Sequence, residues 1–155
     1  MNLILDMDGT LINEKKEPRP HLQAFFHYIF QHFERVSIWT AALDVWFNDV
    51  YQHVFKPLIP KGKSFHFVWC RDKCKLLNIG SSTMIVKPLS KIYNSFPNFY
   101  NQRNTLIIDD THFTYRENIG NAIKISSYSN NRSDTELVKI IQQFQHRIFN
   151  QSKMR

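Results

Sequence analysis

Short apolar segments that each end at a polar side chain are the feature that most restricts the fold of this sequence. Residues 2–5 (NLIL), 36–39 (VSIW) and 105–108 (TLII) are examples, and such runs beside turn-forming residues are typical of buried strands. All the strands expected on this basis are residues 2–5, 36–39, 65–69, 84–86, 105–108 and 122–125. The polar residues that follow them are Asp6, Asp8, Thr40, Lys87, Asp109 and Asp110.

Segments with helical periodicity lie between these strands. Within residues 20–35 the apolar side chains recur three and four positions apart, and within residues 41–55 they recur every four positions. A closing helix is expected from Ser133, with Glu136 completing a capping box. Strands that alternate with helices predict an α/β fold in which helices flank a mostly parallel sheet.

Composition indicates one folded domain. The chain has 155 residues, of which 43% are hydrophobic and 21% charged, and this balance supplies a core and excludes a disordered class. We expect a single domain over residues 1–149 and a flexible tail over residues 150–155. The formal charge of +7 favours anionic partners, namely phosphorylated peptides, nucleic acid or acidic lipid, without choosing among them.

The cellular setting is predicted from what interrupts the apolar segments. Asp6 and Asp8 break the first one where a signal peptide needs a continuous run, and no segment reaches the length of a membrane span. We expect an intracellular protein of the cytoplasm or nucleus that does not bind membranes. Cys70 and Cys74 lack the spacing of redox or zinc motifs, although zinc at these cysteines and His66 is a less favoured alternative.

Each polar strand end also has a simpler interpretation. An acid after a strand often caps a helix or turn, Thr40 is a possible cap, and Lys87 is a possible solvated charge. The carboxyl ends of neighbouring parallel strands, however, meet at one edge of a sheet. Carboxylates packed together there require a cation or a proton to neutralise them, so the set predicts a site.

Four motifs of the sequence resemble a known family. DMDGT at residues 6–10, Thr40 in SIWTAA, Lys87 in VKPL and the acids of LIIDD resemble, in order, the motifs of haloacid dehalogenase (HAD) superfamily phosphatases. The segments RPHLQAFF, VWCRDKC and SDTELVKIIQQF resemble the FCP/SCP-like phosphatases of the RNA polymerase II carboxy-terminal domain. The resemblance runs from Asn2 to about Phe144 and implies a Rossmann-like HAD fold with no large cap domain.

The resemblance implies a role for each motif residue. Asp6 would be the nucleophile that forms an aspartyl-phosphate, and Asp8 the general acid and then the base. Thr40 and Lys87 would bind the transferring phosphoryl group. Mg²⁺ would be held by carboxylates at these strand ends. The expected ligands are Asp6, the backbone carbonyl of Asp8, and the pair Asp109 and Asp110, with the member that binds directly left open.

Two further residues match the family less specifically. Arg71 falls where the family has an arginine near the substrate phosphate, and the alternative is a solvated loop charge. Trp46 falls at the rim of the peptide groove, and the alternative is core packing. The sequence departs from the family at Gly9, which replaces an acid, and at residues 11–19, where a longer hairpin is usual.

These residues predict a Mg²⁺-dependent phosphatase that acts on phosphoserine or phosphothreonine of a protein, with the RNA polymerase II tail as one candidate. A nucleic-acid end phosphatase or nucleotidase, and a non-catalytic phosphatase-like binding module, are the alternatives. Residues 11–19 and 71–83 are too short to fold as a lid, so we expect an open site for macromolecular substrates. The oligomeric state is not predicted.

Overall fold

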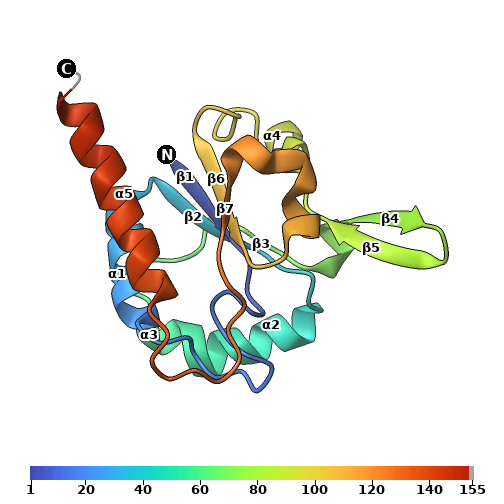
Figure 1. Cartoon of the computed structure of the whole chain (residues 1–155), viewed down its shortest axis with the longest axis horizontal. Helices are drawn as coiled ribbons and strands as arrows, with labels where there is room; N and C mark the ends of the chain where they lie inside the picture. Colours follow the sequence, from blue (N-terminus) through green and yellow to red (C-terminus); the bar gives the residue numbers. More distant parts are fainter. Residues whose placement is uncertain (154–155) are drawn as a thin grey trace.

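Five parallel strands form the central sheet, in the order β3-β2-β1-β6-β7 (Figure 1). The structure is a computed structural model that describes residues 1–153. The strands are β1 (Asn2–Leu5), β2 (Arg35–Trp39), β3 (Val68–Trp69), β6 (Thr105–Asp109) and β7 (Ala122–Lys124). β1 lies between β2 and β6, because Asn2 pairs in parallel with both Arg35 and Thr105. The expected parallel α/β fold is confirmed.

Helices cover both faces of this sheet. Successive side chains of a strand point to opposite faces, so Leu3 and Leu5 pack in the core that holds α1 (Leu22–His32) and the described part of α5 (Glu136–Lys153). Ile4 packs in a second core with α4 (Leu89–Ser95). Burial on both faces explains why β1 is a continuous apolar run.

The first helix forms where the periodicity predicts it, within narrower bounds. Most apolar positions at helical spacing lie in the core, namely Leu22, Phe25, Phe26, Ile29 and Phe30, whereas Phe33 follows the helix and is partly buried. The Phe26 ring meets Phe55 edge-on with 5.5 Å between centroids. His21 precedes the helix in the left-handed conformation (φ 70°), and Phe33 ends it in an extended one. The expected bounds of 20–35 are therefore too wide at both ends.

The expected helix over residues 41–55 is wrong in its start and its regularity. α2 covers Asp44–Val50, a π-helical segment covers Tyr51–Phe55, and α3 covers Lys56–Leu58. Residues 41–43 form a loop instead, because Thr40 Oγ1 accepts a hydrogen bond from the Ala42 N–H at 3.0 Å. This side-chain contact competes with helix formation.

A β-hairpin outside the main sheet was not expected. β4 (Lys75–Ile79) pairs antiparallel with β5 (Ser82–Val86), and the hairpin projects away from the body of the molecule in Figure 1. The strand expected at residues 84–86 is the end of β5. β4 is exposed along most of its length, so it lacks the apolar alternation that would reveal it in the sequence.

The remaining differences concern other connections. The third expected strand, residues 65–69, is reduced to the two residues of β3, although the His66 N–H still donates to Val36 O. The strand expected at residues 122–125 ends at Lys124. The helix α4 and the 3₁₀ segment η3 (His112–Asn121) were not expected.

The closing helix starts later than its capping pattern predicts. α5 starts at Glu136, and its N–H donates to Asp134 Oδ1 at 3.0 Å, so the acid rather than Ser133 provides the cap. α5 continues to Lys153, although we expected a flexible tail from residue 150. Residues 154 and 155 of the expected tail lie outside the described residues. In residues 1–153 no helix has the length and hydropathy to cross a bilayer.

Candidate active site

Lys87 joins the acids of two neighbouring strands. Its Nζ donates to Asp6 Oδ1 at 2.7 Å and to Asp109 Oδ2 at 2.9 Å. Asp6 follows β1, Asp109 ends β6, and Lys87 follows β5, where its N–H donates to Thr114 O. Lys87 and Asp109 are each 1% exposed and Asp6 is 5% exposed. Three sequence-predicted residues therefore form one buried ion cluster.

Burial and mutual charge set the protonation of this cluster. Burial disfavours the charged form of Lys87, but the carboxylates of Asp6 and Asp109 outweigh it and raise the pKa of the ammonium. Burial raises the pKa of Asp6 to about 6; Lys87 opposes this rise, while Asp110 adds to it. Burial, and then the charge of Asp6, raise the pKa of Asp109. One ammonium thus faces an excess of carboxylates.

The acids fit a divalent cation. Asp6, Asp109 and Asp110 each offer a carboxylate oxygen, and these oxygens all lie within 4.8 Å of one another. Thr10 Oγ1 contacts the two sides of this cluster, at 2.9 Å from Asp6 Oδ2 and 3.4 Å from Asp110 Oδ1. Ser127 Oγ donates to Asp110 Oδ2 at 2.6 Å. Hard oxygen ligands of this kind suit Mg²⁺.

Gly9 is required by its contact with Asp110. Its φ of +79° is in the left-handed region, and a Cβ built there would overlap the Asp110 carboxylate. Its carbonyl accepts hydrogen bonds from the Tyr128 N–H at 2.8 Å and from Arg19 Nη1 at 3.2 Å. A glycine at this position therefore leaves room for the Asp110 carboxylate.

A buried arginine that the sequence analysis did not select holds the loop behind Gly9. The Arg19 side chain has no solvent exposure, and it pairs with both carboxylate oxygens of Asp134 at 2.9 Å. It also donates to the carbonyls of Thr10 and Ser126. Arg19 and Asp134 lie in the segments RPHLQAFF and SDTELVKIIQQF, but no local pattern connects residues this far apart. The structure alone shows that they position the first motif.

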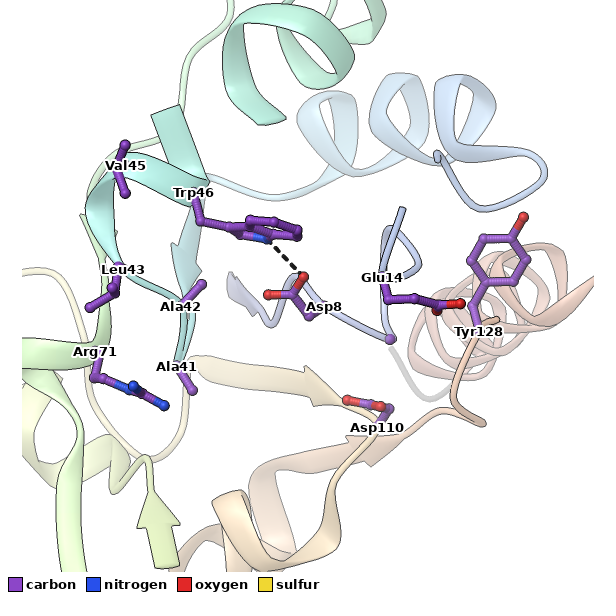
Figure 2. A pocket seen from close by; sticks show the side chains of 11 residues that line it. Asp8, Glu14, Ala41, Ala42, Leu43, Val45, Trp46, Arg71, Asp110 and Tyr128 are labelled. Carbon is purple, nitrogen blue, oxygen red and sulfur yellow. Dashed lines mark hydrogen bonds between the residues drawn. The ribbon is translucent and has the colours of Figure 1, made fainter. Parts of the chain in front are cut away.

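A pocket of about 650 Å³ adjoins the carboxylate cluster at Asp110, which lines it (Figure 2). It is lined by four of the predicted site residues, Asp8, Trp46, Arg71 and Asp110. The other four are buried and do not line the pocket, and they are Asp6, Thr40, Lys87 and Asp109. Glu14 and Tyr128 also line it, and neither was selected from the sequence.

Trp46 contacts a candidate catalytic acid. Its Nε1 donates to Asp8 Oδ1 at 3.0 Å, as Figure 2 shows. Burial raises the pKa of Asp8, and the Trp46 hydrogen bond and the Lys87 charge oppose that rise. The indole also packs against the core and carries Lys16 Nζ 4.1 Å from its ring centroid. Both interpretations of Trp46, pocket rim and core packing, thus describe part of its environment.

Thr40 and Arg71 enter the site from neighbouring loops. Thr40 follows β2, is 1% exposed, and accepts the Ala42 N–H through its hydroxyl oxygen, so its own proton remains to be donated. Arg71 begins the 3₁₀ turn η2 (Arg71–Lys73), where its N–H donates to Ala42 O at 2.9 Å. Figure 2 shows its guanidinium directed into the pocket.

The alternative zinc site is not supported. His66 Nδ1 is 2.7 Å from the Tyr100 hydroxyl, and burial raises the pKa of Cys70 to about 12, which favours the neutral thiol over a metal-binding thiolate. Across the part of the chain that the structure describes, the one group of three potential ligands is Asp6, Asp109 and Asp110.

Comparison with known proteins identifies the family. The family model of the NLI interacting factor-like phosphatases matches residues 1–155. The chain belongs to this family. Two relatives, from Danio rerio and Arabidopsis thaliana, are each 26% identical over 154 aligned positions and are both named ubiquitin-like domain-containing CTD phosphatase. The alignments cover 90% of this chain but 47% and 44% of those relatives, so the chain spans about half their length.

Solved structures confirm the fold. The structure of Fcp1, an essential RNA polymerase II CTD phosphatase, is 18% identical to this chain and matches it with a TM-score of 0.61. The match covers 99% of this chain and 49% of the Fcp1 chain. Fission yeast Fcp1 bound to beryllium fluoride is also 18% identical with a TM-score of 0.59, covering 92% and 50%. These similarities confirm the Rossmann-like HAD fold that the motifs indicate.

Proposed function

We propose that this chain is a phosphatase that hydrolyses phosphoserine or phosphothreonine in a protein. The observation that carries the proposal is the buried Lys87, which holds Asp6 and Asp109 next to the pocket that Asp8 and Asp110 line. A lysine fixed between two acids at strand ends serves no evident need of the core, because burying charges is costly. It does suit transfer of an anionic phosphoryl group.

Two acids would carry the covalent steps. Asp6 attacks phosphorus, the bond between phosphorus and the serine oxygen breaks, and Asp8 donates its proton to that leaving oxygen. Asp8 then takes a proton from water, which attacks the aspartyl-phosphate and releases phosphate from Asp6. The hydrogen bond from Trp46 fixes the orientation of the Asp8 carboxyl during both steps.

The surrounding groups would bind the phosphoryl oxygens. Thr40 donates its hydroxyl proton and Arg71 supplies a guanidinium from the pocket wall. Lys87 neutralises charge on Asp6, and Asp109 holds Lys87 in place. This leaves Asp110, which is only partly buried and faces Asp6, as the more direct metal ligand of the pair.

The same carboxylates would bind Mg²⁺, with Asp6, Asp110 and the Asp8 carbonyl as ligands. The ion supplies charge neutralisation for the transferring group when bound. Thr10 and Ser127, which donate to these carboxylates, orient them for that purpose.

An open pocket favours a macromolecular substrate. Residues 11–19 form a compact loop and β4–β5 form a two-stranded hairpin, so neither segment folds as a lid domain. The substrate itself must then cover the reacting centre. The relatives are named CTD phosphatases and the solved structure Fcp1 is named an RNA polymerase II CTD phosphatase, so the RNA polymerase II tail is one candidate substrate.

The test is to incubate the chain and Mg²⁺ with a phosphoserine peptide, a 3′-phosphorylated oligonucleotide and an aryl phosphate in parallel. We expect release of phosphate that a chelator abolishes, with the largest kcat/KM for the peptide. A larger kcat/KM for the oligonucleotide would assign the protein to nucleic-acid ends, and activity on none of the three would favour a binding module.

A further inference from the structure

A second pocket, of about 500 Å³, lies next to the candidate active site. We refer to it as the hairpin pocket, because residues of the β4–β5 hairpin line it. Arg71 lines both pockets, so the two hollows adjoin at this side chain. The other lining residues are Asp72, Cys74, Leu76, Thr83 and Ile85.

An apolar pair forms one wall of the hairpin pocket. Leu76 and Ile85 are directly opposite each other across the antiparallel strands, so their side chains share a face. Leu76 is 60% exposed and Ile85 is partly buried. Apolar side chains beside a guanidinium, in a hollow, are typical of a surface that binds a ligand.

Backbone contacts hold the two pockets in a fixed relation. Arg71 N–H donates to Ala42 O in the loop that follows Thr40, and Cys74 N–H donates to Arg71 O at 3.0 Å. Cys74 Sγ, on the hairpin pocket side, is 3.6 Å from Thr40 O. The hairpin pocket is therefore connected through Cys74 to the backbone of Thr40, which binds phosphate in the proposed mechanism.

Backbone hydrogen bonds hold the hairpin, because β4 pairs with β5 from Lys75–Val86 to Ile79–Ser82 and the Lys87 N–H that follows β5 donates to Thr114 O of η3. Lys75 Nζ pairs with Glu117 Oε1 of η3 at 3.1 Å, and Thr83 Oγ1 donates to Asn78 Oδ1 across the strands at 3.0 Å. The pocket is thus a preformed surface, and binding there requires little ordering of the chain.

From this arrangement we infer that the hairpin pocket binds an apolar side chain of the substrate polypeptide, close in sequence to the phosphorylated residue. The inference rests on the proposed function. Because both pockets include Arg71, an extended peptide with its phosphate beside Arg71 continues into the hairpin pocket on one side. Leu76 and Ile85 would then contact the apolar side chain.

The charges of the pocket favour a polypeptide over a polynucleotide. Asp72 lies on its wall and repels a polyanionic backbone, while Leu76 and Ile85 offer nothing to a phosphate or sugar. Arg71 is the one basic residue of the lining, and a single phosphorylated residue satisfies it. A phosphoprotein with an apolar residue near its phosphoserine matches all of these features.

The experiment uses phosphoserine peptides that carry leucine or serine at each of four positions on either side of the phosphorylated residue. Values of kcat/KM are measured for the full chain, Leu76→Ser and Ile79→Ser. Ile79 is the matched control, because it is 50% exposed on the same strand but does not line the pocket. The ratio between paired peptides cancels any change in the chemical step.

We expect the wild type and Ile79→Ser to prefer leucine at one position by roughly tenfold, as for burial of one leucine side chain. Leu76→Ser should reduce that preference to less than about twofold. Absence of a preferred position, or equal preferences in all three proteins, would overturn the inference.

Binding of the same peptides to Asp6→Asn, measured by fluorescence anisotropy, separates this inference from the proposed function. If the wild type hydrolyses no peptide but Asp6→Asn binds the leucine peptide more tightly, and Leu76→Ser in that background removes the difference, the pocket stands and the phosphatase proposal fails. If peptides are hydrolysed and no leucine preference appears in turnover or binding, the phosphatase proposal stands and the pocket assignment is wrong.

Discussion

The indole Nε1 of Trp46 donates a hydrogen bond to Asp8 Oδ1 over 3.0 Å, and so connects α2 to the loop that follows β1. The donor stabilises the ionised carboxylate, whereas burial of Asp8 stabilises the protonated form. The protonation of the proposed general acid thus depends on a residue that we selected as a rim contact.

We expect Trp46→Phe to move the alkaline limb of the pH profile of kcat/KM to higher pH for phosphoserine peptides. The substitution removes the donor, so the pKa of Asp8 rises further and the acid stays protonated to higher pH. Aryl phosphates, whose leaving group needs no proton, should keep the wild-type limb. A uniform loss of rate with an unmoved limb would show that Trp46 serves only in packing.

Asp6→Asn should abolish turnover and raise thermal stability in metal-free buffer at pH 7. The folded pKa of Asp6, about 6, lies above its ordinary value of 3.8, so ionising the carboxyl opposes folding. That penalty is absent below pH 3.8 and complete above about pH 6. An amide avoids it, and we expect a gain of about 2 kcal/mol at pH 7.

Thermal unfolding from pH 4 to pH 8 in the presence of a chelator checks this expectation. Glu34→Gln is the control, because Glu34 is an exposed acid whose hydrogen-bond and ion-pair partners, Arg35 and the N-terminal amine, lie away from the candidate site. A destabilised Asp6→Asn at pH 7, or one with near wild-type turnover, would contradict the assignment of Asp6.

Gly9→Ala should raise the Mg²⁺ concentration needed for half-maximal activity by about tenfold, as for other residues that orient metal ligands. The new methyl group would displace the Asp110 carboxylate. Gly62→Ala is a matched control, since Gly62 has nearly the same φ, +81°, but no atom within 4 Å of a Cβ. Activity titrations with Mg²⁺ measure both, and an equal change in the two variants would point to backbone strain alone.

Asp134→Asn should destabilise the fold by about 3 kcal/mol, because it leaves the buried Arg19 guanidinium without its counter-charge. Glu136→Gln, which breaks only an exposed pair with Lys139, should cost less than about 0.5 kcal/mol. Urea unfolding at pH 7 compares the two variants. If Asp134→Asn lowers the free energy of unfolding no more than Glu136→Gln does, the Arg19–Asp134 pair does not hold the fold together as we expect.

The same pair predicts a dependence on pH. Burial acts to raise the pKa of Asp134, but the hydrogen bonds from Arg19 and from the Glu136 N–H, with the charge of Arg19, outweigh it and lower the pKa below 3.8. Its contribution to stability is therefore complete above the ordinary pKa and is lost as pH falls through the lowered one. The difference in stability between wild type and Asp134→Asn should shrink below about pH 4.

Local sequence patterns were sufficient for the strand ends and insufficient for contacts between distant segments. Asp6 and Asp109 were predicted together because parallel strands deliver their carboxyl ends to one edge, whatever the loops do. Lys87 reaches them from the end of β5, which lies outside the parallel sheet, so this rule does not account for its position. The Arg19–Asp134 pair was not predicted, because nothing in either segment encodes its partner. The proposed assignment of Asp110 rather than Asp109 as the more direct metal ligand also rests on coordinates, namely the hydrogen bond from Lys87 to Asp109 and the partial exposure of Asp110.

The prediction of secondary structure failed where a side chain competes with the backbone for a hydrogen bond and where a segment is exposed. Thr40 takes the Ala42 N–H and delays α2 to Asp44, a contact that periodicity does not register. β4 was missed because few of its side chains are buried. Both failures lie beside the pocket, in segments whose conformation suits ligand contact more than regular packing.

The central place of β1 also governs how the molecule reaches its folded state. Asn2 pairs with Thr105, so β1 gains its second neighbouring strand only through a contact between residues about a hundred positions apart in the sequence. Until β6 docks, an apolar strand keeps one edge open to association with other chains. Assembly of the Asp6–Lys87–Asp109 cluster is therefore tied to the slowest class of contact in the fold, and a chain that has not closed this pairing exposes a segment prone to aggregation.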